Sequence, residues 1–489
     1  MPDCLILNPG GAHGIYGALG DDLVAVEQPL WVRLIAGYLR DKGHSVKIVD
    51  ADAERLDPKQ VTARVLHERP SLVCIAAFGH QPSASTQSMH GAGLTARMIK
   101  NYGPNIPIIM VGGHVAALPE RTLREEAIDF ACNGEGPVTV EALLSAQLPY
   151  GEVPGLVWRD GEKIRNNKPA DLLDVKELSG NAWDLLPMDK YRAHNWQCFG
   201  NLGSRQPYAS IYTSLGCPYK CSFCCIQSPF SPEVNGNRYR TRAPAEVVAE
   251  IKILHEQYGV STIKIIDELF VLQKKHYTAI CQGIIDAGLG DKLNIWAYAR
   301  VDTVHPETLS LLRKAGVRWL ALGIESGSKH VRDGAAKALR NDDILGVVRT
   351  VQEHGIYVIG NYIFGLADDD MDSMQATLDL AMDANTEFAN FYSAMAYPGS
   401  RLYDNAVATG ATLPASWAGY SQHNAECRPL DTEHVSGAEV LRFRDEAFVQ
   451  YFSNPRYLAM IQEKFGDETV AHIHKMLSYK LKRKLLEPA

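Results

Sequence analysis

The chain has 489 residues, 46% of them hydrophobic and 22% charged, which is an ordinary composition for a globular protein of several domains. Its formal net charge of −8 at pH 7 argues against a nucleic acid partner, which would require a basic surface. The N-terminus lacks the basic and apolar stretches of a signal peptide, and we expect no membrane span. The ten cysteines show no secreted disulfide pattern, so we expect a cytoplasmic protein.

The first third of the chain alternates short apolar segments with amphipathic ones. Strands are expected at residues 3–8, 46–50, 72–77, 108–111 and 128–131, and helices at 29–42, 58–68, 86–101, 119–126 and 137–146. This alternation predicts an α/β domain over residues 1–150, built on one doubly wound parallel sheet of the Rossmann-like type. Ligands of such sheets bind beyond the carboxyl ends of the strands.

The loops that follow these strands are rich in glycine and small polar residues. Glycines let the backbone approach a ligand closely, and hydroxyl or amide side chains can hydrogen-bond to it. The candidate ligand-binding residues in these loops are Gly79, Gln81, Ser83, Ser85, Gly112, Gly113, Gly134, Glu135 and Gly136. A dinucleotide site would need G-x-G-x-x-G after the first strand, which is absent, although Asp50 ends the second strand where a ribose-binding acid would lie.

Residues 151–205 are expected to connect two domains, with a β-hairpin around Asp160 and Gly161 and with aromatic residues packing between the domains. A second alternation then begins. Strands are expected at residues 208–213, 263–268, 293–300, 319–325, 357–364 and 388–395, and helices at 244–258, 275–286, 306–315, 342–354 and 371–384. Six strand–helix units over residues 206–400 predict a curved parallel sheet, a partial (β/α)6 barrel.

Residues 401–489 are expected to be mostly helical, with helices at 436–452 and 455–482. The basic residues 480–484 are most simply interpreted as an exposed helix end.

The loop after the first strand of the second alternation carries Cys217, Cys221 and Cys224 in the pattern C-x-x-x-C-x-x-C. Thiolates suit zinc, copper(I) or iron–sulfur clusters. No fourth ligand follows at a regular interval, which indicates a metal site with one open position. The adjacent Cys225 is expected to pack beside the site, since neighbouring cysteines rarely chelate one centre. Polar residues at other strand ends would share this face of a barrel, namely Asp267, Glu268, Arg300, Glu325 and Ser326.

This cysteine loop in a partial barrel resembles the radical S-adenosylmethionine (SAM) superfamily, over roughly residues 1–400 together with the preceding sheet. The resemblance implies that Cys217, Cys221 and Cys224 bind three irons of a [4Fe-4S] cluster and that SAM chelates the fourth. It also implies a set of SAM contacts: Phe223 near the adenine, Asp267 or Glu268 at the amino group, Arg300 at the carboxylate, and Glu325 and Ser326 at the ribose. The usual Gly-Gly-Glu is absent, so the sequence leaves open which acid acts.

The first domain is similar to the cobalamin-binding domain that many members of this superfamily carry. Its glycine- and serine-containing loops resemble the pocket for the nucleotide tail of cobalamin. The Asp-x-His-x-x-Gly motif is absent, so neither His13 nor another histidine is expected to bind cobalt.

The resemblance implies reductive cleavage of SAM and methylation of an unactivated carbon of a small-molecule or natural-product substrate, with a flavodoxin- or ferredoxin-type electron donor. Two alternatives stay open: a radical oxidoreductase or cyclase that uses cobalamin without methyl transfer, and a non-catalytic cobalamin- or metal-binding protein.

Overall fold

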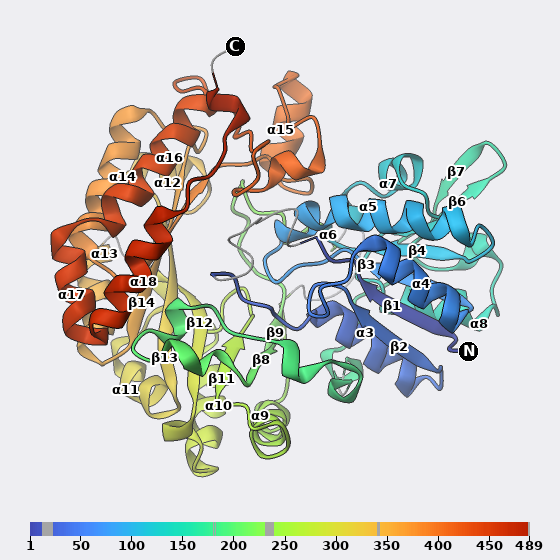
Figure 1. Cartoon of the computed structure of the whole chain (residues 1–489), viewed down its shortest axis with the longest axis horizontal. Coiled ribbons are helices and arrows are strands. Elements are labelled where there is room, and N and C mark those ends of the chain that lie inside the picture. Colours follow the sequence, from blue (N-terminus) through green and yellow to red (C-terminus); the bar gives the residue numbers. More distant parts are fainter. Residues whose placement is uncertain (12–22, 179, 181, 230–238, 340–342, 488–489) are drawn as a thin grey trace.

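The computed structural model describes residues 1–11, 23–178, 180, 182–229, 239–339 and 343–487. Two α/β units face each other (Figure 1), one built on each of the two main sheets. The C-terminal helices pack against the second unit, where α16 (Gly437–Phe452) lies against the last strand of its sheet. The loops at the strand ends of both units therefore lie between the two sheets.

The first sheet has seven strands in the order β2-β1-β3-β4-β5-β6-β7. Their bounds are Cys4–Asn8 (β1), Val46–Asp50 (β2), Leu72–Ala76 (β3), Ile108–Val111 (β4), Phe130–Cys132 (β5), Leu156–Asp160 (β6) and Lys163–Asn166 (β7). Strands β1 to β5 pair in parallel, which confirms the predicted sheet. The predicted hairpin is also present as β6 and β7, but it extends this sheet by two antiparallel strands and does not stand apart as a connection.

Helices cover both faces of this sheet because successive strand residues point to opposite sides. Cys4 and Ile6 belong to one apolar cluster, whereas Leu5 and Leu7 belong to another. The first cluster includes residues of α3, and the second includes residues of α4 and α5. The helices of this unit are α3 (Leu30–Asp41), α4 (Pro58–Glu68), α5 (Ala84–Tyr102), α6 (Gly113–Ala117), α7 (Pro119–Glu125) and α8 (Pro137–Ser145).

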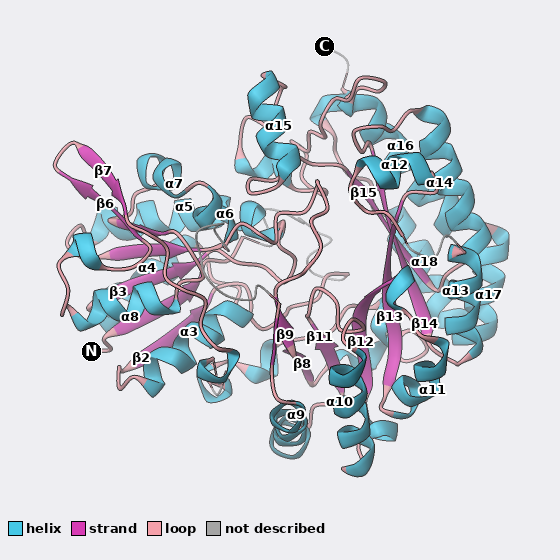
Figure 2. Cartoon of the chain, turned by 180° about the vertical axis from the view of Figure 1, so that it is seen from behind, coloured by secondary structure: helices cyan, strands magenta, loops and turns pink. Residues whose placement is uncertain are grey.

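The second sheet has six parallel strands in the order β15-β14-β13-β12-β11-β8. Their bounds are Tyr208–Ile211 (β8), Thr262–Ile265 (β11), Asn294–Arg300 (β12), Val317–Glu325 (β13), Tyr357–Phe364 (β14) and Phe388–Ser393 (β15). The sheet curves, with helices on its outer side (Figure 2), and its order is open, so the predicted partial barrel is confirmed. The helices that follow its strands are α9 (Pro244–Tyr258), α10 (Lys274–Asp286), α11 (Pro306–Lys314), α12 (Lys329–Gly334), α13 (Ile344–Glu353) and α14 (Met371–Ala384).

The connecting segment packs its aromatic residues against the second unit, and Trp183 also lies under Arg33 of α3, so the expected packing between the units is confirmed for Trp183. Trp183 and Trp196 are both buried. The Trp183 indole donates to Glu250 of α9, and the Trp196 ring lies 5.0 Å from that of Trp296 in the curved sheet. A further short pair, β9 (Ser214–Leu215) with β10 (Arg240–Thr241), closes the base of the cysteine loop.

The C-terminal region contains α15 (Arg401–Thr409), α16, α17 (Pro455–Phe465) and α18 (Asp467–Ser478). A single helix over 455–482 was therefore the wrong prediction, because Gly466 adopts φ 81° and ψ 175° and ends α17. The basic residues 480–484 do not end a helix, so that part of the prediction was also wrong, but Lys480, Lys482 and Lys484 are exposed as expected. The chain leaves α18 at Ser478, and the buried Arg483 donates to Asp445 at 2.8 Å. No described helix is long and apolar enough to cross a membrane.

Candidate active site

The cysteine loop leaves the sheet after β8 and folds back on itself. Gln227 donates to the carbonyl of Cys217 at 2.8 Å, and the amide of Cys224 donates to the carbonyl of Cys221 at 3.2 Å. These three cysteines are partly exposed, whereas the other seven cysteines are buried. The buried Cys225 lies in an apolar cluster with Met395 and other residues, as expected for a packed neighbour.

The donor set of this loop fits an iron–sulfur cluster better than a single ion. Among the described residues, no three His, Cys, Asp or Glu side chains converge on one metal position. In a [4Fe-4S] cluster each thiolate binds a different iron, so the three sulfurs need not converge on one point. Burial raises the pKa of the Cys217 thiol to about 11, so metal binding at this cysteine has to displace a proton.

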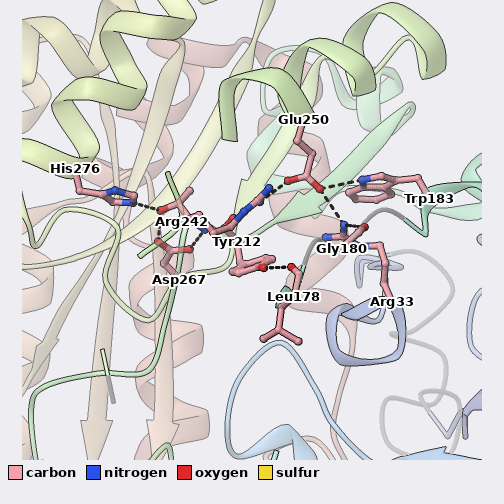
Figure 3. A network of polar contacts seen from close by, with 10 residues as sticks. Arg33, Leu178, Gly180, Trp183, Tyr212, Arg242, Glu250, Asp267 and His276 are labelled. Atoms are coloured by element: carbon pink, nitrogen blue, oxygen red, sulfur yellow. Dashed lines mark hydrogen bonds and ion pairs between the residues drawn. The ribbon is translucent and has the colours of Figure 1, made fainter. Parts of the chain in front are cut away.

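Asp267, one of the two candidate acids after β11, anchors the chain that enters the cysteine loop. Its carboxylate accepts from the Thr213 amide at 2.6 Å, the Thr213 hydroxyl at 2.5 Å and the Ser214 hydroxyl at 2.7 Å. Figure 3 shows Asp267 beside His276, whose Nε2 lies 3.0 Å from Thr213 Oγ1. These contacts use both carboxylate oxygens, so Asp267 is poorly placed to bind an additional ligand.

Glu268 has the opposite character. It accepts no hydrogen bond from the residues that the structure describes, and it lines a small cavity together with Gly216 and Cys225. Burial, and then the neighbouring Asp267 carboxylate, raises the pKa of Glu268 to about 8. Of the two acids, Glu268 is therefore the one with acceptor oxygens available beside the cysteine loop.

Arg300 packs against the cysteine loop at the end of β12. Its guanidinium lies 4.0 Å from the ring centroid of Tyr219, donates to Asp302 at 2.9 Å, and donates to the carbonyl of Ala338 at 2.9 Å. Most of its donors are therefore used within the protein, and its predicted contact with the SAM carboxylate stays a prediction.

Glu325, at the end of β13, has φ 67°, which is rare for a residue other than glycine. Its carboxylate lies 2.7 Å from Nζ of the buried Lys337. The neighbouring Ser326 is fully buried, and its hydroxyl contacts Thr377 Oγ1 and accepts from the Ser328 amide at 3.1 Å each. Phe223 packs against a small apolar cluster that includes Leu366 and Ala394. Of these two residues, Glu325 is therefore the better candidate for the predicted contact with the SAM ribose.

A cavity of about 1280 Å³ extends from the carboxyl ends of β1 to β3 to the inner face of the curved sheet. It exceeds the range of roughly 300–1,000 Å³ that is usual for one small-molecule site, so it has room for more than one ligand. Gly79, Gln81 and Ser83 line it, together with Tyr298 and Asn390 from the second sheet. A Cβ on Gly79 would lie 2.2 Å from Cβ of Ala84, so this position needs glycine to keep the loop against α5.

The other residues predicted for the cobalamin pocket hold the surrounding loops in place. Ser85 accepts from the His114 amide at 2.9 Å and donates to the carbonyl of Ala77. A Cβ on Gly112 would lie 2.3 Å from that same carbonyl oxygen, so this turn needs glycine. The carbonyl of Gly113 accepts from Ser228 of the cysteine loop at 2.8 Å.

Glu135 forms a buried ion pair with Arg240 of β10, so it links the two units. The flanking Gly134 and Gly136 have φ values of 147° and 109°. None of these three residues is part of the described lining of the large cavity. His13 lies outside the described residues, so its predicted lack of a role stays a prediction.

Sequence reasoning missed two buried lysines near the site. Lys264 lies within β11, with Nζ 2.9 Å from Glu27, and Lys337 pairs with Glu325. A lysine between Ile263 and Ile265 in an apolar strand was a readable signal for Lys264, because a buried ammonium needs a partner. Lys337 follows α12 between Ala336 and Ala338 in a short turn, where no helical or strand periodicity marks it.

Two family models match the chain: the B12 binding domain over residues 18–144 and the radical SAM superfamily over residues 211–381. An uncharacterized methyltransferase of Pyrococcus horikoshii is 29% identical, covering 88% of this chain and 89% of that protein. An anaerobic magnesium-protoporphyrin IX monomethyl ester cyclase of Rubrivivax gelatinosus is 26% identical, covering 80% and 68%. The radical SAM methyltransferase TsrM of Kitasatospora setae, solved with cobalamin and a [4Fe-4S] cluster, shares the fold with a TM-score of 0.66 at 19% identity, covering 86% and 85%.

Proposed function

We propose that this chain, which belongs to the radical SAM superfamily and carries an N-terminal B12-binding domain, is a cobalamin-dependent methyltransferase. Its substrate is a small molecule methylated at an unactivated carbon. The observation that carries the proposal is a shared wall. Gly79 and Gln81 line both the large cavity and the small cavity beside Cys225 and Glu268. Cobalamin on the first sheet and SAM at the cysteine loop would therefore meet at one place.

The chemistry of this reaction comes from the cofactors. When bound, the [4Fe-4S] cluster, SAM and cobalamin supply reductive cleavage of SAM and a transferable methyl group. The chain would hold and orient them: Cys217, Cys221 and Cys224 would bind the cluster, and Glu268 would contact the SAM amino group. Aromatic side chains of the large cavity, such as Trp296 and Tyr298, keep water away from the reacting atoms.

The rival function within the class is a radical cyclase or oxidoreductase that uses cobalamin without methyl transfer. The similarity to the Rubrivivax cyclase keeps this reading open. The products separate the two functions. A methyltransferase forms S-adenosylhomocysteine and a product heavier by one methylene, whereas a cyclase forms a product that has lost hydrogen and gained no methyl group.

The first test is anaerobic purification of the full chain, reconstitution with iron, sulfide and cobalamin, and an absorption spectrum followed by cofactor extraction. We expect bands of both cobalamin and an iron–sulfur cluster, and SAM cleavage after addition of a reductant. A chain that binds neither iron nor cobalamin, or a cluster that never cleaves SAM, would contradict the proposal and favour a non-catalytic binding protein.

The electron donor and the location belong to the same proposal. A flavodoxin- or ferredoxin-type protein would reduce the cluster, and the cytoplasm would keep the cysteine loop reduced. All ten cysteines are free thiols in the structure, which suits a reducing compartment. Reduction of the cluster by a purified flavodoxin with its reductase tests the donor.

A further inference from the structure

The turn at residues 335–338 packs between the cysteine loop and the curved sheet. The carbonyl of Ala335 accepts from the Ser222 amide at 3.0 Å and from its hydroxyl at 3.3 Å. On the other side, Arg300 donates to the carbonyl of Ala338 at 2.9 Å. The turn is therefore attached both to the residue after Cys221 and to the end of β12.

This turn directs one buried cation toward the site. Ala336 adopts a left-handed φ of 53°, and the amide of Lys337 donates to the carbonyl of Arg332 at 2.8 Å. Arg332 in turn donates to the carbonyl of Ser326 at 2.6 Å. Lys337 is only 7% exposed, and its Nζ lies 2.7 Å from Glu325 Oε1. Its backbone and its ammonium group are thus held at the same strand end.

Glu325 needs such a partner because its carboxylate is buried, and its backbone is also strained. A left-handed φ of 67° on a non-glycine residue persists only where the surroundings enforce it, and such residues cluster at functional sites. The ion pair also occupies the space above Gly323. A Cβ on Gly323 would lie 2.8 Å from Glu325 Oε1 and 2.9 Å from Lys337 Nζ. The absence of a side chain there leaves room for this arrangement.

The surroundings keep Lys337 charged. Burial disfavours the ammonium form, but the Glu325 carboxylate and the nearby Cys221 outweigh it and raise the pKa of Lys337 above its usual value. Several exposed lysines instead form ion pairs on the surface. Lys329, on the same helix–turn segment, lies 3.6 Å from Asp333 with both side chains exposed.

We propose that Lys337 is a positioning residue of the SAM and cluster site, which orients Glu325 toward SAM and places a positive charge beside the cluster. This inference rests on the proposed function. The Glu325 carboxylate alone would disfavour the reduced, more negative form of the cluster, so the paired ammonium of Lys337 keeps the reduction potential from falling. The same cation fixes the Glu325 carboxylate at the end of β13, where it would accept hydrogen bonds from SAM.

The test uses the full chain with a reconstituted cluster and compares Lys337→Met with the matched surface variant Lys329→Met. Cluster potentials are measured by redox titration with electron paramagnetic resonance, and SAM affinity by equilibrium dialysis. We expect Lys337→Met to weaken SAM binding about tenfold, the effect of losing one charge-assisted hydrogen bond, and to shift the potential to more negative values. Lys329→Met should change neither quantity.

Two further variants guard against simple misfolding. The double variant Lys337→Met/Glu325→Gln leaves no unpaired buried charge, so it should recover the wild-type potential and still bind SAM weakly. Gly323→Ala crowds the same ion pair and should weaken SAM binding without removing a charge. A Lys337→Met protein with wild-type SAM affinity and potential would overturn the inference, as would a double variant that regains full SAM affinity.

The wild-type protein separates this inference from the proposed function. If it binds no cluster or no SAM, the proposed function fails, and the inference fails with it. If the wild type binds both and the Lys337 variants show the same SAM affinity and potential as the wild type, the proposed function stands and the inference alone is wrong.

Discussion

Arg33 Nη1 lies 2.9 Å from Glu250 Oε1, with both side chains buried, and this ion pair joins α3 of the first unit to α9 of the second. Glu250 also accepts from Arg242 at 2.5 Å and from the Trp183 indole at 2.9 Å (Figure 3). One carboxylate therefore gathers three donors from the first unit, the connecting segment and the second unit. Such a network fixes the relative position of the two sheets, and with it the cavity between them.

Removing this carboxylate should destabilise the whole chain. Glu250→Gln leaves Arg33 and Arg242 buried without a counter-charge, and breaking a buried pair in this way costs about 3–5 kcal/mol. Urea unfolding monitored by fluorescence measures the change. The control is Arg40→Ala, which removes an exposed pair with Asp184 and should cost about 1 kcal/mol or less. Equal losses in both variants would contradict the structural role of Glu250.

Four cysteine variants test the cluster ligands. Cys217→Ala, Cys221→Ala and Cys224→Ala should each abolish SAM cleavage, because each removes one of three iron-binding thiolates. Cys225→Ala should keep the cluster and cleave SAM, since the Cys225 side chain is buried in an apolar cluster. Iron analysis and release of SAM fragments under reducing conditions measure these outcomes. Equal loss of SAM cleavage in all four variants would contradict the assignment of Cys225 as a packed neighbour and not a ligand.

The two acids after β11 should respond differently when each carboxyl group is replaced by an amide. Glu268→Gln should weaken SAM binding about tenfold at unchanged iron content, because Glu268 offers its oxygens to the site. Asp267→Asn should instead lower iron incorporation, since it disturbs three hydrogen bonds that hold Thr213 and Ser214. Iron analysis and equilibrium dialysis with SAM measure both effects. The reverse result would assign the SAM contact to Asp267.

The loop after β3 should tolerate no side chain at Gly79. Gly79→Ala places a Cβ 2.2 Å from Ala84, so the loop has to move and bound cobalamin should fall several-fold. The absorption spectrum of the reconstituted protein measures cobalamin, and its iron content should stay unchanged. Gly151→Ala is a matched control, because a Cβ there meets no atom within 4 Å. Full cobalamin binding by Gly79→Ala would remove this loop from the pocket.

Asp50 predicts a pH-dependent stability. Burial, and then the nearby Asp52, raises its pKa to about 6, against hydrogen bonds from Asn8 and Tyr191 at 2.7 and 2.8 Å that favour the charged form. The folded chain therefore holds this proton more tightly than the unfolded chain, whose Asp50 has a pKa near 3.8. Stability contributed by Asp50 is full below about pH 4 and is lost as the pH rises to about 6.

The expected loss is on the order of 3 kcal/mol, since one pKa unit corresponds to about 1.4 kcal/mol. The free energy of unfolding is measured between pH 4 and pH 7 for the wild type and for Asp50→Asn. The loss appears as a change with pH in the difference between the two free energies. A difference that does not vary with pH in this range would contradict the raised pKa of Asp50.

Local patterns were enough to predict both sheets. Strand residues such as Leu5 and Ile6 are apolar on two faces because helices cover both, so each strand stands out as a short apolar run. Gly466 ends α17, but the helical spacing of apolar residues continues on both sides of it. That spacing therefore led to the prediction of one helix instead of two. The hairpin was recognised from Asp160 and Gly161, but its pairing with β5 depends on contacts that no local pattern contains.

The candidate site was only partly predictable for a related reason. The spacing of the cysteines is local and readable. Whether a polar residue faces a ligand or another side chain depends on distant partners: Asp267 on Thr213, and Glu135 on Arg240. Lys337 could not be predicted for the same reason, because its role depends on its ion pair with Glu325, which lies twelve residues earlier in the chain.

The ion pair between Glu135 and Arg240 has a consequence for how such proteins can be recombined. Arg240 lies in β10, which pairs with β9 at the base of the cysteine loop. Its ion pair therefore links Glu135 of the first unit to that base. A chimera that took its first 150 residues from a relative would break this link unless the new domain also carried an acid at this position. The two domains are thus separate folds but not interchangeable parts, and engineered swaps should transfer Glu135 and Arg240 as a pair.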